Sequence, residues 1–372
     1  MTGLFEQWLA AVEPMVRAES PSGDIARLEA LAAQIAESFR ARGAEVALEP
    51  AGGAGTHLLA RLGAPRSTGR GPLLILGHFD TVHPVGTLDR LPFQVEDDRV
   101  TGPGVYDMKG GIAALLVALD RLTERGERLR DQVLVYLTCD EESGSATSRA
   151  RIEELGRSAR GALVLEPSLP GGGVKLARKG VALYHVAVEG VPAHAGIEPE
   201  AGASAIHELL RVLGTVLGLA DARVETTLNA GTIQGGTASN VVAERAAADV
   251  DVRFWTRGEA ERVHAAMQGL KPRDPRCTLT VAGGVNRYAL EETPGSRALF
   301  DVAVEQARAL GFPLSGGGTG GASDGNLLAG VGCPTLDGLG PDGGGAHSLH
   351  EFVYREPLPA RIELLARLLS RL

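Results

Sequence analysis

Residues 73–80 are LLILGHFD, residues 109–126 are KGGIAALLVALDRLTERG and residues 131–142 are DQVLVYLTCDEE. The first and third stretches are short apolar runs that end in polar residues, which is typical of buried parallel strands. The stretch between them has the apolar spacing of a helix. A helix at 149–161 and a strand at 162–167 continue the alternation. This order predicts an α/β domain with a mostly parallel sheet.

The sequence pattern changes near residue 180. From there, strands and helices follow in the order β-α-β-β-α-β, which is the ferredoxin-like pattern. We therefore predict an inserted α+β domain at 180–286, and a first domain made of 1–179 and 287–372. In the insertion we expect strands at 181–190, 226–236, 243–255 and 278–285 and helices at 203–217 and 258–270; after it we expect helices at 294–311 and 359–371, with a glycine-rich loop at 315–326.

Composition excludes several classes of protein. Hydrophobic residues make up 44% of the 372, so a large core can be buried, and the 50 glycines have no collagen period. A net charge of −9 disfavours nucleic-acid binding, and no apolar run is long enough for a membrane span. Three cysteines and an N-terminus without a basic signal-peptide region predict a cytoplasmic protein.

Polar residues with metal-binding chemistry follow the predicted strands. His78 and Asp80 end the first strand, Asp140-Glu141-Glu142 directly follow the second and Glu166 follows the third. The carboxyl ends of strands in open α/β sheets are where ligands bind. Each motif also has a plainer interpretation. The acids at 140–142 could form a solvated turn, and a histidine two residues from an aspartate is a weak signal.

Two further segments add donors. Asp107 lies in GPGVYDMKGG (102–111), where it could cap the following helix or face a metal. His347 lies in GAHSLHEFV (345–353). Together the segments supply enough imidazoles and carboxylates for two metal ions that share one carboxylate, with one more carboxylate as a base. Such ligands suit Zn²⁺, with Co²⁺ or Mn²⁺ as alternatives.

The ordered motifs GHFDTV, GPGVYDMKGG, CDEESGS, LEP, GVPAHAG and HSLHEFV resemble those of a known family. It is the dinuclear-zinc family of glutamate carboxypeptidases, acetylornithine deacetylase, succinyl-diaminopimelate desuccinylase and aminoacylase. The sequence is most similar to the glutamate carboxypeptidase branch. The resemblance implies a zinc-peptidase catalytic domain and an inserted dimerisation (lid) domain, and hence a homodimer.

The resemblance also implies roles for particular residues. Asp107 would bridge two zinc ions and be followed by a cis peptide bond to Met108. His78 and Glu166 would complete one metal site, and Glu142 and His347 the other. His350 could bind a metal if its segment were helical, but the resemblance places the ligand at His347.

The same resemblance assigns the remaining functional side chains. Glu141 would be the general base, and Asp80 would orient His78. His194 would help hold the oxyanion, often from the partner subunit. Arg287 would bind the substrate α-carboxylate, although relatives usually have proline where this chain has Tyr288. Asn240 would contact the substrate.

Two enzymatic hypotheses and one non-enzymatic hypothesis follow. The first is a carboxypeptidase that releases a C-terminal amino acid, with glutamate as the leading candidate. The second is a deacylase of N-acyl amino acids. A catalytically silent binding protein is disfavoured because Glu141 is present. The expected partner is a small peptide or N-acyl amino acid, with no nucleic acid or membrane involved.

Overall fold

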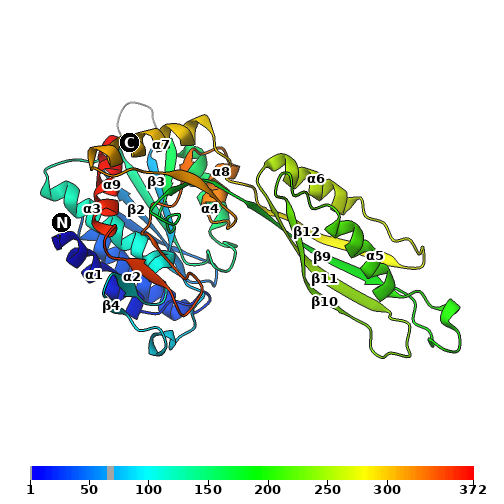
Figure 1. The fold of residues 1–372 in the computed structure, drawn as a ribbon. Helices are drawn as coiled ribbons and strands as arrows, with labels where there is room; N and C mark the ends of the chain where they lie inside the picture. The colour runs from blue at the N-terminus through cyan, green and yellow to red at the C-terminus, as the bar shows by residue number, and fades with distance from the viewer. Residues whose placement is uncertain (1, 65–70) are drawn as a thin grey trace. The chain divides into compact units, whose positions relative to one another are not determined.

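The computed structural model describes residues 2–64 and 71–372, and the chain separates into two units (Figure 1). The first unit comprises Met1–Ala177, Glu292–Thr319 and Ser323–Leu372. The second comprises Arg178–Glu291 with Gly320–Ala322. Each unit has its own hydrophobic core, so we describe each by itself.

A six-stranded sheet forms the centre of the first unit. β6, β3, β7 and β14 run parallel to one another, whereas β1 and β2 are antiparallel at one edge. This confirms the predicted α/β class with a mostly parallel sheet. The strand order is β1 (Glu45–Pro50), β2 (Thr56–Leu62), β6 (Val133–Thr138), β3 (Leu73–His78), β7 (Gly161–Val164) and β14 (Thr335–Leu336).

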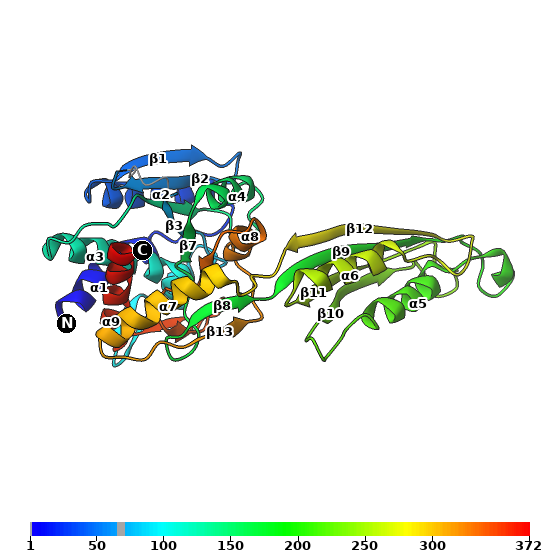
Figure 2. The same cartoon turned by 90° about the horizontal axis from the view of Figure 1, so that it is seen from above.

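Helices cover both faces of this sheet (Figure 2). Side chains alternate across a strand, so Ile75 packs on one face of β3 while Leu74 and Leu76 pack on the other. The Ile75 face is covered by α1 (Thr2–Arg17), α2 (Ile25–Arg40), α3 (Gly110–Glu124), α7 (Pro294–Ala309) and α9 (Leu358–Arg371), and the opposite face by α4 (Arg149–Ser158) and α8 (Gly325–Gly330).

α3 is buried along most of its length, which fixes the loop that precedes it. Gly111 makes this possible: a Cβ there would lie 2.3 Å from the carbonyl oxygen of Leu165. The indole of Trp8 donates a 2.9 Å hydrogen bond to the carbonyl of Gly110. The start of α3 is therefore held against β7 on one side and α1 on the other.

The second unit has the predicted β-α-β-β-α-β order. Its four strands form an antiparallel sheet in the order β10-β11-β9-β12. The buried side chains of β9 alternate with exposed ones, so one face packs against the two helices. The elements are β9 (Gly180–Glu189), α5 (Ala205–Leu217), β10 (Thr227–Gly235), β11 (Arg245–Phe254), α6 (Arg257–Gln268) and β12 (Thr278–Arg287), with a 3₁₀ turn at Pro199–Ala201.

The structure differs from the sequence interpretation in several places. The glycine-rich segment 315–326 is not only a loop: it contains β13 (Gly316–Thr319), which pairs with β8 (Val174–Arg178), and the start of α8. The interpretation also assigned no element to α2, β1 or β2. Four short strands form one small sheet: β4 (Gln94–Glu96), β5 (Arg99–Thr101), β15 (Gly343–Gly344) and β16 (Phe352–Tyr354). The remaining short elements are the 3₁₀ turn Thr87–Asp89 and the π-helical turn Val105–Lys109.

Two further observations bear on the cellular setting. Cys139, Cys277 and Cys333 are free and buried. Among the described residues, no helix is both long enough and apolar enough to cross a bilayer. The cytoplasmic location stays a prediction.

Candidate metal centre

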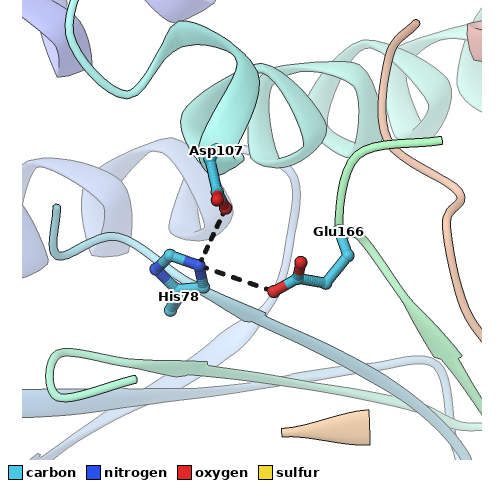
Figure 3. Close-up of side chains that lie close together, drawn as sticks. All are labelled: His78, Asp107 and Glu166. Carbon is cyan, nitrogen blue, oxygen red and sulfur yellow. Dashed lines mark ion pairs between the residues drawn. The ribbon is translucent and has the colours of Figure 1, made fainter. Parts of the chain in front are cut away.

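Two groups of metal-binding side chains meet at one end of the parallel sheet. His78, Asp107 and Glu166 form the first group, and Asp107, Glu142 and His347 form the second. Within each group the ligand atoms lie within 4.8 Å of one another. Figure 3 shows the first group, in which one nitrogen of the His78 ring faces both carboxylates. The five residues that we predicted as ligands therefore lie together, and Asp107 belongs to both groups.

The fold explains why these residues converge. His78 is the last residue of β3, Glu142 follows β6 and Glu166 follows β7. Because these strands are parallel neighbours, their carboxyl ends meet at one sheet edge. Asp107 comes from the turn before α3, and His347 comes from the segment between β15 and β16.

The distances show that Asp107 faces both histidines. Its Oδ1 lies 3.3 Å from Nε2 of His78, and its Oδ2 lies 3.5 Å from Nε2 of His347. His78 Nε2 is also 3.6 Å from Oε1 of Glu166, and His347 Nε2 is 3.2 Å from Oε2 of Glu142. Since each oxygen of Asp107 points to a different group, its carboxylate has the arrangement of a bridging ligand.

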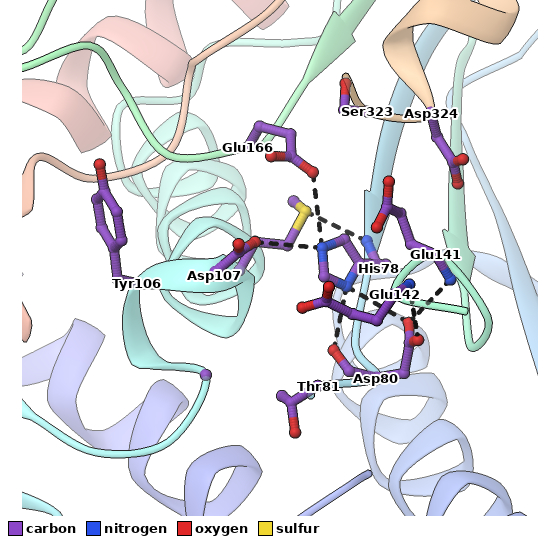
Figure 4. Close-up of polar contacts among 12 residues, drawn as sticks. His78, Asp80, Thr81, Tyr106, Asp107, Glu141, Glu142, Glu166, Ser323 and Asp324 are labelled. Atoms are coloured by element: carbon purple, nitrogen blue, oxygen red, sulfur yellow. Dashed lines mark hydrogen bonds and ion pairs between the residues drawn. The ribbon is translucent and has the colours of Figure 1, made fainter. Parts of the chain in front are cut away.

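Asp80 links His78 to the turn that carries Glu141 and Glu142 (Figure 4). Nδ1 of His78 lies 3.1 Å from the Asp80 carbonyl oxygen and 3.4 Å from Oδ1. The buried Asp80 carboxylate accepts hydrogen bonds from the backbone N–H of Glu141 (3.2 Å) and Glu142 (3.1 Å). It also accepts one from the Ser22 hydroxyl at 2.7 Å. Asp80 thus fixes both the imidazole and the acidic turn.

Glu141 and Glu142 extend in different directions from this turn. In Figure 4 the Glu142 carboxylate lies beside the His78 ring, whereas the Glu141 carboxylate points away from Asp80. Glu142 belongs to the second ligand group and Glu141 to neither. Asp140 is outside both groups too, and it holds the turn by accepting hydrogen bonds from Thr147 and Ser148.

The electrostatics match a cation site. Burial opposes ionisation of Asp107, but His347 and His78 hold its pKa well below the usual range. Burial likewise opposes protonation of His78, yet Asp107, Asp80 and Glu166 keep its pKa well above the ordinary value. Interactions with Asp107 and Glu142 raise the pKa of His347 to about 10. Burial raises the pKa of Glu142.

The donor set fits bound metal. Oδ1 of Asp107 is buried and accepts no hydrogen bond within the described part of the chain. An unsatisfied buried carboxylate oxygen is costly, and a metal ion there would satisfy it. Imidazoles and carboxylates are ligands that Zn²⁺ accepts. His78, Asp107 and Glu166 would hold one ion, and Asp107, Glu142 and His347 a second.

Metal binding should release protons. At neutral pH His347 carries a proton in the metal-free protein, because its pKa is about 10, and a ligating imidazole must be neutral. Zinc affinity should therefore rise with pH up to about 10, by about tenfold per pH unit for each proton displaced. Calorimetric titration in two buffers of different ionisation enthalpy measures this release, and equal heats in both buffers would contradict the expectation.

The backbone conformations at two ligands are unusual. The peptide bond between Asp107 and Met108 is cis, as the resemblance implied. His347 has a φ of 61°, which is uncommon for a residue with a side chain. Nearby, Gly345 has a φ of 76°, and a Cβ there would lie 2.3 Å from the carbonyl oxygen of His350. His350 itself is exposed and outside both ligand groups.

The remaining predicted site residues belong to the second unit, and Arg287 lies apart from the other two. Arg287 ends β12 and pairs with Val181 near the start of β9. It is buried and donates to Oδ1 of Asn286 at 3.1 Å. His194 is exposed and lies beyond the end of β9, where its Nδ1 accepts from the N–H groups of Gly196 and Ile197.

Asn240 lies beside His194. The carbonyl of Asn240 accepts a 2.9 Å hydrogen bond from the N–H of Ala195, and His194 forms a β-bridge with Val241. Most of β9 lies between this pair and Arg287. The separation is ~25 Å at the usual rise per residue of a strand. One copy of the second unit therefore presents Arg287 at one end and His194 with Asn240 at the other.

Sequence reasoning missed residues that hold the ligands. One of them is Ser22, which donates to the Asp80 carboxylate. Its sequence context, Ser20-Pro21-Ser22-Gly23, carries no metal-binding signal. Glu351 and His83 were missed too: Glu351 accepts hydrogen bonds from the Asp107 loop and from His83.

The chain is similar to known proteins over most of its length. Residues 74–371 match the model of Peptidase family M20/M25/M40. The chain is 30% identical to carboxypeptidase G2 of Pseudomonas sp. (strain RS-16), over 98% of this chain and 89% of that protein. It is also 30% identical to succinyl-diaminopimelate desuccinylase of Gluconacetobacter diazotrophicus, over 85% of this chain and 84% of that one.

A solved structure supports the fold. The aminopeptidase PepT of Bacillus cereus aligns with a TM-score of 0.79, at 24% identity and over 98% of both chains. The family match covers most of the chain, and the relatives extend nearly over its full length. The chain therefore belongs to Peptidase family M20/M25/M40 and is a metal-dependent hydrolase of amide bonds.

Proposed function

We propose that this chain is a dinuclear zinc carboxypeptidase that hydrolyses the amide bond of a C-terminal amino acid, glutamate being the first candidate. The position of Asp107 carries the proposal, because its two oxygens face two separate ligand groups. Co²⁺ or Mn²⁺ could replace zinc at ligands of this type. The similarity to carboxypeptidase G2 supports the choice of substrate class.

The chain's own residues have distinct tasks in this reaction. When bound, the two metal ions would polarise the substrate carbonyl and lower the pKa of water. Glu141 would accept the proton of the attacking water and return it to the leaving nitrogen. Its neighbour Glu142 belongs to a ligand group, so the turn held by Asp80 would place the base directly beside a ligand.

Arg287 would bind the free α-carboxylate of the substrate. A guanidinium presents a planar set of donors that matches a carboxylate. Arg287 is buried, and its Nη1 donates to Oδ1 of Asn286. This residue would restrict the enzyme to substrates with a free carboxylate next to the scissile amide.

We further propose a homodimer formed through the second unit. Arg287 and His194 lie at opposite ends of β9, so one copy of this unit does not offer both to one small substrate. His194 of the partner subunit, with its neighbour Asn240, would supply the oxyanion contact. Exposed Leu183, Leu210 and Ile233 provide apolar surface on this unit. Sedimentation equilibrium tests the dimer, and a monomer at micromolar concentration contradicts it.

A deacylase of N-acyl amino acids is the second candidate, favoured by the similarity to succinyl-diaminopimelate desuccinylase. Both reactions hydrolyse an amide bond and release an amino acid. They differ in the acyl group on the other side of that bond.

A two-way substrate panel separates the two activities. One series keeps the acyl group and varies the C-terminal residue, including folate-type glutamates; the other keeps the amino acid and varies the acyl group from acetyl and succinyl to aminoacyl. Selectivity for the C-terminal residue with peptide acyl groups supports the carboxypeptidase, whereas preference for simple acyl groups supports the deacylase. Metal-stripped protein, inactive until zinc is restored, is the control, and no cleavage in either series would exclude both.

A further inference from the structure

Glu351 is a buried carboxylate that binds the loop of Asp107. Its Oε1 accepts hydrogen bonds from the backbone N–H groups of Tyr106 and Asp107, both at 2.9 Å. Its Oε2 accepts one from the N–H of Gly104 at 2.9 Å and lies 2.7 Å from Nε2 of His83. The residue is fully buried, so water does not replace these bonds.

The loop needs these acceptors because of its backbone conformation. Gly104 has a φ of 74°, and Asp107 has φ −115° and ψ 96°, outside the helical range. N–H groups in such a loop do not all find a carbonyl partner, and buried ones are costly when unsatisfied. Both oxygens of Glu351 are used here, since each accepts from two donors.

A buried lysine lies near the Glu351 side chain. The ammonium of Lys109 is buried two residues after Asp107, and among nearby carboxylates Glu351 acts on it most strongly. Hydrogen bonds that involve a charged partner are stronger than neutral ones. As a carboxylate, Glu351 offers both oxygens to the N–H groups of the Asp107 loop, which a neutral amide does not.

Glu351 also connects the two parts of the second ligand group. It lies four residues after His347, on the segment that leads into β16. Its bonds to the Asp107 loop tie that segment to the turn before α3. The Glu351 side chain thus restrains both the loop of Asp107 and the segment that carries His347.

We infer that Glu351, held by His83, is a positioning residue that sets the place of Asp107 as the ligand shared by both metals. This inference rests on the bridging role of Asp107 in the proposed function. Glu351 is in neither ligand group, so it acts through Asp107 and not on the metals or the substrate.

Glu351→Gln tests this role because an amide keeps the size of the side chain and changes only its hydrogen bonding. One oxygen of the carboxylate becomes an NH₂ group, which would face N–H donors and repel them. We expect about 10–100-fold weaker binding of Co²⁺ and Zn²⁺, the range typical for residues that orient metal ligands. At saturating metal, KM should stay near the wild-type value.

Glu363→Gln is the matched control. Glu363 is also a buried glutamate of the first unit, and it accepts hydrogen bonds from Arg121 (3.1 Å) and Arg125 (2.5 Å). A general loss of stability would lower the melting temperature of both metal-free variants. Only Glu351→Gln should weaken metal binding, which is measured by direct titration without substrate. Wild-type affinity in folded Glu351→Gln, or equal losses in both variants, overturns the inference.

Two provisions keep the test decisive. Should Glu351→Gln fail to fold, the same titration is made on His83→Ala, which removes one donor and leaves the backbone bonds in place. Weaker metal binding in that variant supports the inference, and wild-type affinity overturns it. The metal titration uses no substrate. Its result therefore does not depend on whether the substrate panel supports the proposed substrate class.

Discussion

Glu141→Gln is expected to lower kcat by about 10²–10⁴-fold and to leave the metal content unchanged. General acid–base catalysis contributes a factor of that size, and an amide neither accepts nor returns the proton. Glu141 is outside both ligand groups, and its backbone N–H, which binds Asp80, is kept in the variant. Steady-state kinetics together with metal analysis of the same sample measure both quantities.

Glu142→Gln is the control for this prediction, because it changes the neighbouring side chain, which does belong to a ligand group. That variant should lose metal as well as activity, whereas Glu141→Gln should lose activity alone. Turnover near the wild-type level in metal-replete Glu141→Gln would show that Glu141 is not the general base. Metal loss in Glu141→Gln would instead make it a ligand.

Asp107→Asn is expected to weaken both metal sites and to reduce activity by at least about a thousandfold. Metal ions supply several kcal/mol of transition-state stabilisation, and each 1.36 kcal/mol corresponds to a factor of ten. An asparagine has one carbonyl oxygen in place of the two carboxylate oxygens that face His78 and His347. Metal analysis after dialysis against a fixed free zinc concentration gives the stoichiometry.

Glu166→Gln and Asp107→Asn make a matched pair of variants. Glu166 belongs to the first ligand group only, so its variant should retain the second metal. A stoichiometry near one for Glu166→Gln and near zero for Asp107→Asn is the expected pattern. Loss of a single ion in Asp107→Asn would contradict a shared ligand.

Part of the candidate ligand set could be predicted from residue types at strand ends. Apolar runs locate the strands, and parallel pairing brings His78, Glu142 and Glu166 to one edge. The turn of Asp107 was recognisable from its glycines. His347 was assigned by family resemblance, since the segment around it has no pattern of its own.

The residues that hold these ligands gave no such signal. Glu351 acts by accepting backbone N–H bonds, and an acceptor for main-chain donors has no preferred sequence spacing. His83 is buried against Glu351, a residue far along the chain, so its sequence neighbours do not reveal the contact. β13 consists of three glycines and a threonine, and glycine disfavours strands unless a partner strand compensates.

The positions of the candidate ligands along the chain determine the order in which they are synthesised. His78, Asp107, Glu142 and Glu166 all precede the second unit, which begins at Arg178, whereas His347 and Glu351 follow its last segment, Gly320–Ala322. A nascent chain that ends within the second unit already contains His78, Asp107 and Glu166, the first ligand group. It still lacks Glu351, the carboxylate that restrains Asp107. Domains generally fold as units during synthesis. The second candidate ligand group can therefore form only after the inserted unit has been synthesised.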